Sequence, residues 1–205
     1  MTRPDFEAAK KYALKRLEQE LAPELCYHCL AHTKEGVVPS TERLAAMENV
    51  DGIDRELLLT AAYFHDIGYV EDTNRHEEIG ARIAAEMLAQ FNFDADHIQR
   101  ICSMILATRL PQSPEDILEA ILADADLEVL GRDDFLLRSL ELRDELESLG
   151  ESHTDAEWFL RQLRFLQSHH FWTQSAKTLR DAKKKENIAL LERLLAQSQS
   201  NQHAE

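Results

Sequence analysis

A chain of 205 residues with 44% hydrophobic and 30% charged residues is long enough for one sizeable core, and its make-up is that of an ordinary globular protein. Its 23 Lys and Arg against 38 Asp and Glu give a net charge of −15, which repels nucleic-acid phosphates and anionic lipids. We therefore expect neither nucleic acid nor membrane as a partner. A small phosphorylated ligand stays open, because a metal ion reverses the sign of the charge locally.

Three cysteines, Cys26, Cys29 and Cys102, do not form a disulfide framework, which uses even counts in short secreted chains. The first residues carry no apolar signal region, and no run of 18 apolar residues occurs. These features predict a cytoplasmic protein with free thiols, and leave a homo-oligomer open. The Cys26-x-x-Cys29 pair suggests a zinc knuckle only weakly, since no second Cys or His pair follows at the required spacing.

Helix signals dominate the chain, and strand signals are nearly absent. Glycine (6) and proline (5) are scarce, and no Asn-Gly or Asp-Gly hairpin turn lies between alternating segments. The periodicity predicts an all-α protein, a single-domain helical bundle. In chain order the expected helices cover residues 6–21, 24–33, from 40 to about 50, 54–66, 75–91, from 94 to about 106, 113–126, 134–149, 154–168 and from 173 onward.

The stretch that ends in His65-Asp66 places two metal-ligand side chains at the end of an apolar run. Leu57 to Phe64 is apolar apart from Thr60, so it is expected to lie in the interior. Burying an imidazole and a carboxylate costs several kcal/mol unless something pairs with them, and a divalent cation satisfies both. A buried His–Asp hydrogen bond at a helix end is the alternative.

Two further pairs of polar residues flank this stretch. His28 and His32 are four residues apart, so on a helix they share one face and can aim at one point, unless they are ordinary surface histidines. Asp124 and Asp126 lie in an apolar segment, where one could be exposed and the other a cap. Their side chains point about 200° apart on a helix, so only one of them is expected to be a ligand.

Taken together, the order His…His-Asp…Asp on a helical chain resembles the HD superfamily of metal-dependent phosphohydrolases. The resemblance covers about residues 24–132, and it implies metal ligands at His32, His65, Asp66 and Asp124, with Asp126 as the alternative. Tyr27-His28-x-x-x-His32-Thr33 also resembles the start of the cyclic-nucleotide phosphodiesterase motif. That likeness implies a catalytic role for His28, which would protonate the leaving oxygen, beside Asp66.

The resemblance also predicts how the chain is divided into parts. Residues 1–23 are expected to form an N-terminal helix that packs on the core, and residues 24–132 an HD-type metal-binding core. Residues 133–196 would supply C-terminal helices that complete the same domain, and residues 197–205 a disordered tail.

Many relatives with two metals add histidines after the His-Asp pair. Here His76 fits one such position, but Thr108 stands where such relatives often have His. That departure favours one divalent ion, which could be Mn, Fe, Ni, Co, Zn or Mg. Lys34, Arg75, His76 and Arg109 are candidates for holding non-reacting phosphate, with surface salt bridges as the alternative.

These features predict a metal-dependent phosphohydrolase, a phosphomonoesterase or phosphodiesterase, acting on a nucleotide or other small phosphoester with metal-activated water as nucleophile. The alternative is a metal-containing ligand-binding or sensory module without turnover. A third option, an HD-type oxygenase, requires two irons, and Thr108 argues against it.

Overall fold

The computed structural model describes residues 3–202, and within them the chain is helical with no strand. The contacts divide this part of the chain into two compact units. The first unit holds the chain up to Pro23 together with residues 28–126, and the second holds residues 24–27 together with the chain from Leu127 onward. All-α architecture is therefore confirmed. The division after residue 126 differs from the boundaries at 23/24 and 132/133 that the sequence predicted.

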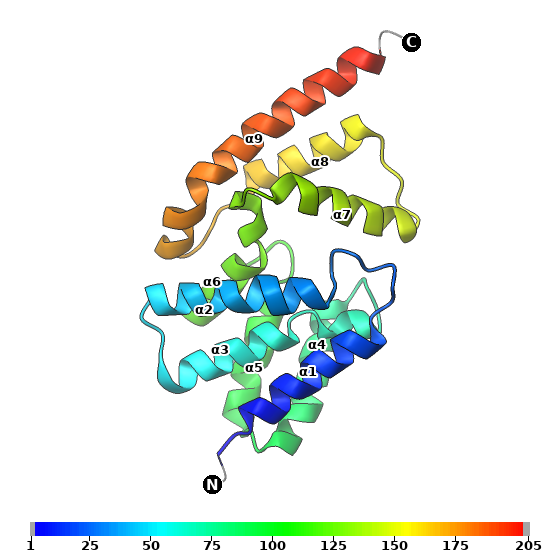
Figure 1. Ribbon diagram of the computed structural model, residues 1–205. Coiled ribbons are helices and arrows are strands. Elements are labelled where there is room, and N and C mark those ends of the chain that lie inside the picture. The colour runs from blue at the N-terminus through cyan, green and yellow to red at the C-terminus, as the bar shows by residue number, and fades with distance from the viewer. Residues whose placement is uncertain (1–2, 203–205) are drawn as a thin grey trace. The chain divides into compact units, whose positions relative to one another are not determined.

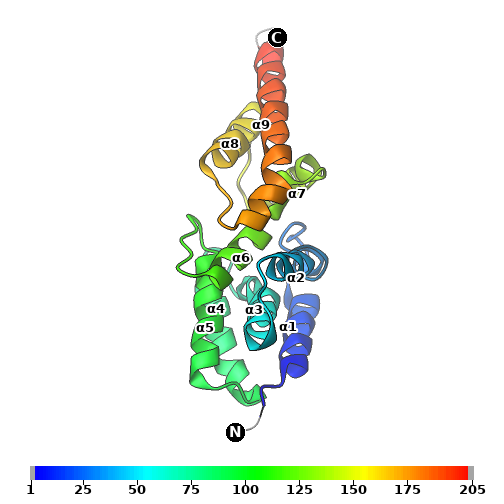
Figure 2. The ribbon, with the colours of Figure 1, turned by 90° about the vertical axis from the view of Figure 1, so that its left-hand side faces the viewer.

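In the first unit, helix α3 lies at the centre with α1, α2, α5 and α6 packed around it (Figures 1 and 2). Its position follows from its composition, because Leu57, Leu58, Ala61 and Phe64 are completely buried. The elements of this unit are α1 (Phe6–Glu20), η1 (His32–Val37), α2 (Val38–Met47), α3 (Gly52–Phe64), η2 (Ile67–Val70), α4 (His76–Leu88), η3 (Ala89–Phe91), α5 (Ala95–Ala107) and α6 (Ile117–Asp126).

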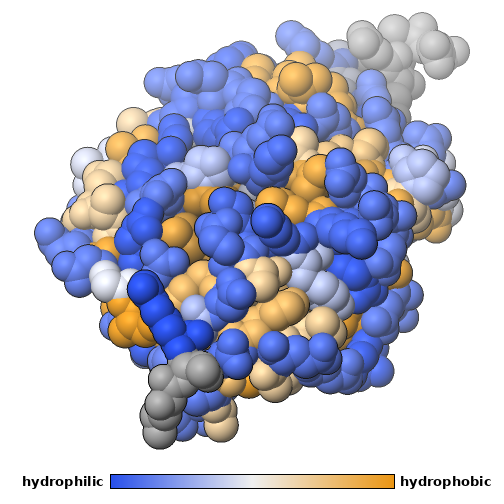
Figure 3. Space-filling view, turned by 60° about the horizontal axis from the view of Figure 1, so that its bottom comes forward, coloured by the Kyte–Doolittle hydropathy of each residue, from blue (hydrophilic) through white to orange (hydrophobic). Residues whose placement is uncertain are grey.

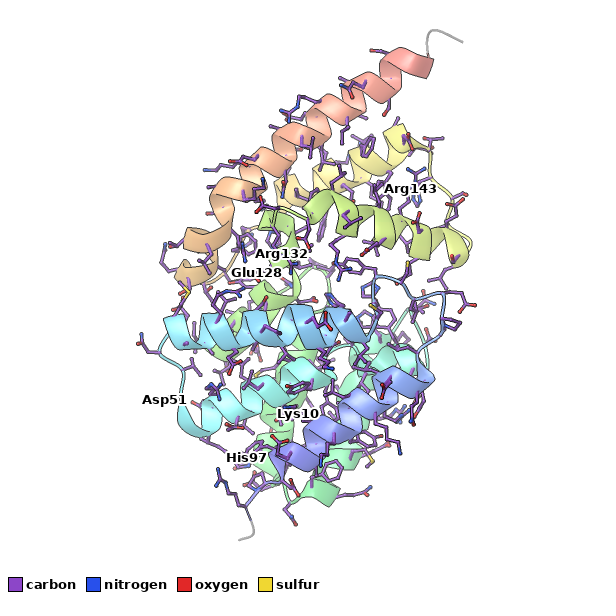
Figure 4. All side chains as sticks on the ribbon, viewed as in Figure 1. Lys10, Asp51, His97, Glu128, Arg132 and Arg143 are labelled. Carbon is purple, nitrogen blue, oxygen red and sulfur yellow. The ribbon has the colours of Figure 1, made fainter. Side chains whose placement is uncertain are left out.

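The second unit consists of η4 (Glu128–Gly131), α7 (Phe135–Ser148), α8 (Asp155–Ser168) and α9 (Gln174–Gln202). Two of its buried polar groups are paired in this way: Arg180 Nε donates to Glu128 Oε1 at 2.9 Å, and Trp158 Nε1 donates to Ser139 Oγ at 3.1 Å. Arg143, labelled on α7 in Figure 4, donates to the His153 carbonyl at 2.6 Å. Such pairing removes the desolvation penalty that a buried polar group otherwise carries.

Several helix starts follow the expected capping chemistry. Asp94 accepts from the His97 N–H at 2.8 Å, and Thr154 forms a capping box with Glu157. The start of α6 lies further along than the Ser113-Pro114 signal suggested. Asp116 accepts from the N–H groups of the second and third residues of α6 at 2.8 and 2.9 Å, so the helix begins only at Ile117.

The helix expected over residues 24–33 is wrong in its first half. Residues 24–29 form turns and bends, and helical structure begins at Leu30. Tyr27 explains the difference, because its backbone N–H donates to the buried Glu145 carboxylate at 2.8 Å instead of to a carbonyl of its own segment. Ser40 is likewise no N-cap, because the chain runs without a break from η1 into α2.

Residues 197–202 are helical, which corrects the tail expected from residue 197 onward. Helix α9 continues to Gln202, and serine hydroxyls donate to carbonyls one turn back, Ser198 to Leu194 at 2.9 Å and Ser200 to Ala196 at 3.0 Å. Residues 203–205 of the expected tail lie outside the described residues.

The surface is mixed rather than apolar. On the face drawn in Figure 3, hydrophobic side chains are interspersed with hydrophilic ones, as the share of charged residues leads one to expect. Among the helices within residues 3–202, none combines the length and the apolar character that crossing a bilayer requires.

Candidate metal centre

Three elements of the first unit bring four polar side chains to one place. His65 and Asp66 follow the last residue of α3, His32 opens η1, and Asp126 closes α6. Helix α3 is buried, so the residues that follow it remain in the interior, where His65 is completely buried and Asp66 is 5% exposed. Residues more than 90 positions apart in the chain are thereby brought within contact distance.

Element η1 is a six-residue π-helix, and it places His32. Its backbone is wider than that of an α-helix, because the Val38 N–H donates to the Thr33 carbonyl, five residues back. Short π-helical segments are rare and are frequently found at functional sites. Here the segment directs an 8% exposed histidine toward the end of α3.

The ligand atoms of His32, His65 and Asp66 all lie within 4.8 Å of one another. Asp66 Oδ2 is 3.2 Å from His65 Nε2 and 3.5 Å from His32 Nε2. Asp126 Oδ1 is 3.3 Å from His32 Nε2 and 3.5 Å from His65 Nε2. Two imidazole nitrogens and two carboxylate oxygens thus face a common centre.

The hydrogen bonds of this cluster leave two of the inward-facing atoms without a partner. His65 Nδ1 lies 2.8 Å from the Ala62 carbonyl, which can only accept, so Nδ1 donates and the neutral ring presents a lone pair at Nε2. His65 Nε2 and Asp66 Oδ2 are both buried without a hydrogen-bond partner. A positive charge between these two electron-rich atoms, from a proton or a metal ion, would satisfy both. Nitrogen and oxygen donors in this number fit a divalent transition metal, with magnesium also compatible.

The electrostatics also favour positive charge at this centre. Burial alone lowers the pKa of His65, but the negative charges of Asp66 and Asp126 outweigh it and raise that pKa well above its ordinary value. Burial opposes ionisation of Asp66, yet the neighbouring imidazoles His65 and His32 hold the pKa of Asp66 far below its usual range. Contacts with the imidazoles of His32 and His65 lower the pKa of Asp126 in spite of its burial. Both carboxylates are therefore ionised at neutral pH.

Asp126, the alternative to Asp124 in the sequence analysis, has its Oδ1 within 3.5 Å of both imidazole nitrogens. Within α6, Ile117 is 46% exposed, whereas residues 121–125 are all buried. A helix buried nearly all round has no single inward face, so periodicity cannot choose between the two aspartates. Asp124 is itself completely buried.

The other residues expected at the site divide into two groups. His76 Nε2 lies 3.8 Å from Asp66 Oδ1, and the ring of His28 is centred 6.0 Å from that of His32, so both border the cluster. Arg75 and Arg109 instead converge on Glu78, at 2.8 and 3.0 Å, as exposed ion pairs. Lys34 is exposed on η1.

Thr108 and Tyr69 complete the neighbourhood. The Thr108 hydroxyl donates to the Ile105 carbonyl of its own helix at 2.8 Å. Tyr69, which sequence reasoning missed, stacks on both His28 and His76. The only sequence signal was Gly68 beside it, whose added Cβ would lie 1.9 Å from the His76 carbonyl oxygen.

An all-helical unit in which His32, His65, Asp66 and Asp126 converge defines a candidate metallohydrolase centre. Residues 28–128 match the model of the HD domain family. This segment of the chain therefore belongs to the HD-domain family. A search of curated proteins found no match.

Solved structures share the fold over nearly the whole chain. A predicted HD superfamily hydrolase from an uncultured Thermotogales bacterium is 20% identical with a TM-score of 0.61, covering 95% of this chain and 93% of its own. A Lactobacillus plantarum protein is 19% identical, with a TM-score of 0.68 and coverage of 98% and 97%. Bacillus subtilis YpgQ, solved in complex with ADP, is 15% identical, with a TM-score of 0.63 and coverage of 96% and 97%.

Proposed function

We propose that this protein is a metal-dependent phosphohydrolase that acts on a nucleotide or other small phosphoester. One observation carries the proposal: two imidazoles and two carboxylates converge on one centre, where His65 Nε2 and Asp66 Oδ2 are buried without hydrogen bonds. Because YpgQ, which shares the fold, was solved with ADP, a nucleotide is a reasonable first ligand to test.

His32, His65, Asp66 and Asp126 would hold one divalent ion, either a transition metal or magnesium. Such an ion, when bound, acidifies a water molecule and polarises a phosphoryl oxygen. The centre would be reachable from solvent, because Asp126 keeps 19% and His32 10% of the side chain accessible. A phosphate group can approach from that side.

His28 is the candidate general acid. Its ring borders the cluster without being one of the four converging groups, since the centre of the ring is 6.0 Å from that of His32. As the bond between phosphorus and the leaving oxygen breaks, that oxygen keeps the electron pair and takes a proton from the His28 imidazole. A positioned acid of this kind contributes about 10²–10⁴-fold to the rate.

His76 is the candidate for holding non-reacting phosphate, because it alone of the four residues considered for this role borders the cluster. Arg75 and Arg109 are engaged by Glu78, and an exposed ion pair of that kind is a common surface feature. The proposal therefore leaves these two arginines, and the exposed Lys34, out of the substrate site.

A turnover assay separates this function from its alternative. The purified full chain is stripped of metal, reloaded in turn with Mn, Fe, Ni, Co, Zn and Mg ions, and offered nucleoside mono-, di- and triphosphates, cyclic nucleotides and sugar phosphates. A phosphohydrolase releases phosphate, or opens the phosphodiester, with at least one metal. Asp66→Ala, which removes a buried carboxylate of the centre, is the matched control and is expected to lack the activity.

The alternative is a ligand-binding or sensory module without turnover. It predicts that nucleotides raise the thermal unfolding temperature of the metal-loaded protein while no product forms, because a ligand that binds only the native state stabilises it. Stabilisation without turnover across the whole panel would contradict the phosphohydrolase proposal.

A further inference from the structure

Tyr69 makes ring contacts with two histidines that border the metal centre. Its ring centre lies 4.4 Å from that of His28 with an interplanar angle of 20°, and 4.0 Å from that of His76 with an angle of 21°. Both geometries are those of stacked rings. The two imidazoles are 6.3 Å apart, so the tyrosine ring is in closer contact with each of them than they are with one another.

The stacked rings border the candidate metal ligands at two points. His76 Nε2 is 3.8 Å from Asp66 Oδ1, and the ring of His28 is 6.0 Å from that of His32. His28 precedes the π-helix and His76 opens α4, so Tyr69 joins two segments that are nearly 50 residues apart in the chain. A single aromatic ring therefore couples two sides of the centre.

The backbone fixes the position of Tyr69. Its N–H donates to the Asp66 carbonyl at 3.1 Å, so the residue lies in the 3₁₀ turn that begins at a candidate ligand. At Gly68 the turn approaches the His76 backbone so closely that an added Cβ would lie 1.9 Å from the His76 carbonyl oxygen. Only glycine permits this approach. The ring is thus placed by the same backbone that places Asp66.

His28 lies outside the regular helices, because residues 24–29 form turns and bends. A general acid must lie within hydrogen-bond reach of the leaving oxygen, and displacement by about 1 Å can cost about 100-fold in rate. The stacked ring of Tyr69 is a contact that orients this imidazole.

We propose that Tyr69 is a positioning residue, which holds the His28 imidazole in the orientation from which it protonates the leaving oxygen. This role rests on the proposed phosphohydrolase function and gives one of its steps a structural support. Stacking needs the aromatic face and not the hydroxyl, so phenylalanine at this position preserves the role and leucine removes it.

A comparison of leaving groups tests the role by activity. A nucleoside 5′-monophosphate releases a basic alkoxide that needs a proton, whereas p-nitrophenyl phosphate releases a weakly basic phenolate that does not. We expect Tyr69→Leu to lower kcat about 30-fold on the nucleotide and less than about threefold on p-nitrophenyl phosphate. Tyr69→Phe should stay within about threefold of the wild type on both. A loss of equal size on both substrates would contradict the role.

Two further variants separate positioning from loss of packing. In the double variant Tyr69→Leu with His28→Gln, the nucleotide reaction should be no slower than in His28→Gln alone, because both changes remove the same contribution. Tyr12→Leu is the matched control: it removes a tyrosine that stacks on Phe64 at 6.1 Å in the same unit. The control should lower stability without changing the ratio of the two rates. Additive losses in the double variant would contradict the proposal.

An NMR measurement provides a readout that needs no turnover. In the full chain labelled at histidine, and free of paramagnetic metal, a stacked aromatic ring shifts the imidazole proton signals of His28 and His76, which the variants His28→Gln and His76→Gln assign. Tyr69→Leu should move both sets of signals and Tyr69→Phe should keep them. If the His28 and His76 signals depend on Tyr69 but the wild-type protein shows no turnover, the phosphohydrolase function is refuted. If the wild-type protein shows turnover but the signals do not depend on Tyr69, the role of Tyr69 is refuted.

Discussion

His65 in the first unit and His169 in the second are both imidazoles withdrawn from solvent, but their neighbours carry opposite charges. His65 faces the carboxylates of Asp66 and Asp126, which raise its pKa well above the ordinary value in spite of burial. Burial and the Lys184 ammonium group lower the pKa of His169 to about 3. Both ring nitrogens of His169 are buried without a hydrogen-bond partner.

The comparison separates two reasons for burying a histidine. A donor nitrogen that faces carboxylates is electrostatically prepared for a cation, whether a proton or a metal ion. A histidine beside a lysine is held neutral and acts as a flat, largely apolar ring, as the contact of His169 with Phe171 at 4.7 Å illustrates. Burial alone therefore does not identify a metal ligand, and the charge of the neighbours does.

The largest effect is expected from exchanging each histidine for glutamine. His65→Gln removes a nitrogen ligand from the centre and should abolish stoichiometric metal binding and all metal-dependent turnover. His169→Gln, its matched control in the other unit, should keep one equivalent of metal. Elemental analysis of the two purified variants measures their metal content. Circular dichroism confirms that each variant remains helical. Full metal content in His65→Gln would remove that residue from the proposed ligand set.

The two aspartates near the end of α6 provide a second test of which buried groups bind the metal. Asp126 Oδ1 lies within 3.5 Å of both imidazole nitrogens, so Asp126→Asn should raise the metal Kd by about 100-fold or more. Asp124→Asn should weaken metal binding by about tenfold or less, through packing around the centre. Metal titrations of both variants measure the difference. A larger loss in Asp124→Asn would return the ligand assignment to the residue favoured by the sequence.

The smallest expected effect is a pH dependence confined to the second unit. The pKa of His169 lies near 3 in the folded state and near 6.5 when unfolded, so in that interval the unfolded chain binds more protons. The stabilisation is complete above about pH 6.5 and is lost as the pH falls towards 3, with a loss of about 2 kcal/mol at pH 4.5. Amide hydrogen exchange in α8 and α9, corrected for intrinsic rates, reports it.

The matched variant and the other unit supply the controls. His169→Phe keeps a flat ring and removes the titration, so protection in α8 and α9 should no longer change between pH 6.5 and 4.5. In the metal-free first unit, the pKa of His65 is raised and that of Asp66 is lowered. The stability that these two groups contribute is lost as the pH rises above the ordinary pKa of histidine or falls below the ordinary pKa of aspartate. Between pH 4.5 and 6.5 it should therefore stay nearly constant. An equal loss of protection in α3 would contradict the assignment to His169.

Sequence reasoning found the residues whose position follows from a simple pattern. His65 and Asp66 follow a helix that buries an apolar run broken only by Thr60, so their place in the interior could be predicted from α3 alone. Asp94 and Thr154 satisfy helix N-termini through local hydrogen bonds, which depend only on nearby residues. Features of this kind are encoded within a few turns of the chain.

Features that depend on distant contacts could not be predicted. Periodicity could not choose between Asp124 and Asp126, because α6 is buried on nearly all sides. The helix expected at residues 24–29 failed because a carboxylate far along the chain, Glu145, binds the Tyr27 N–H. The stack at Tyr69 depends on the close approach of Gly68 to α4, for which a lone glycine gives no specific signal.

The π-helix that begins at His32 means that this part of the chain carries more residues per turn than the α-helix that follows it. Removing one residue between His32 and Val37 would let the segment adopt ordinary α-helical hydrogen bonding continuous with α2. Because one residue corresponds to about 100° of rotation, everything before the deletion, including the imidazole of His32, would turn away from the end of α3. The length of this segment is therefore constrained as well as the identity of its residues. A relative with a one-residue deletion here would keep the motif in its sequence but lose the geometry of the site.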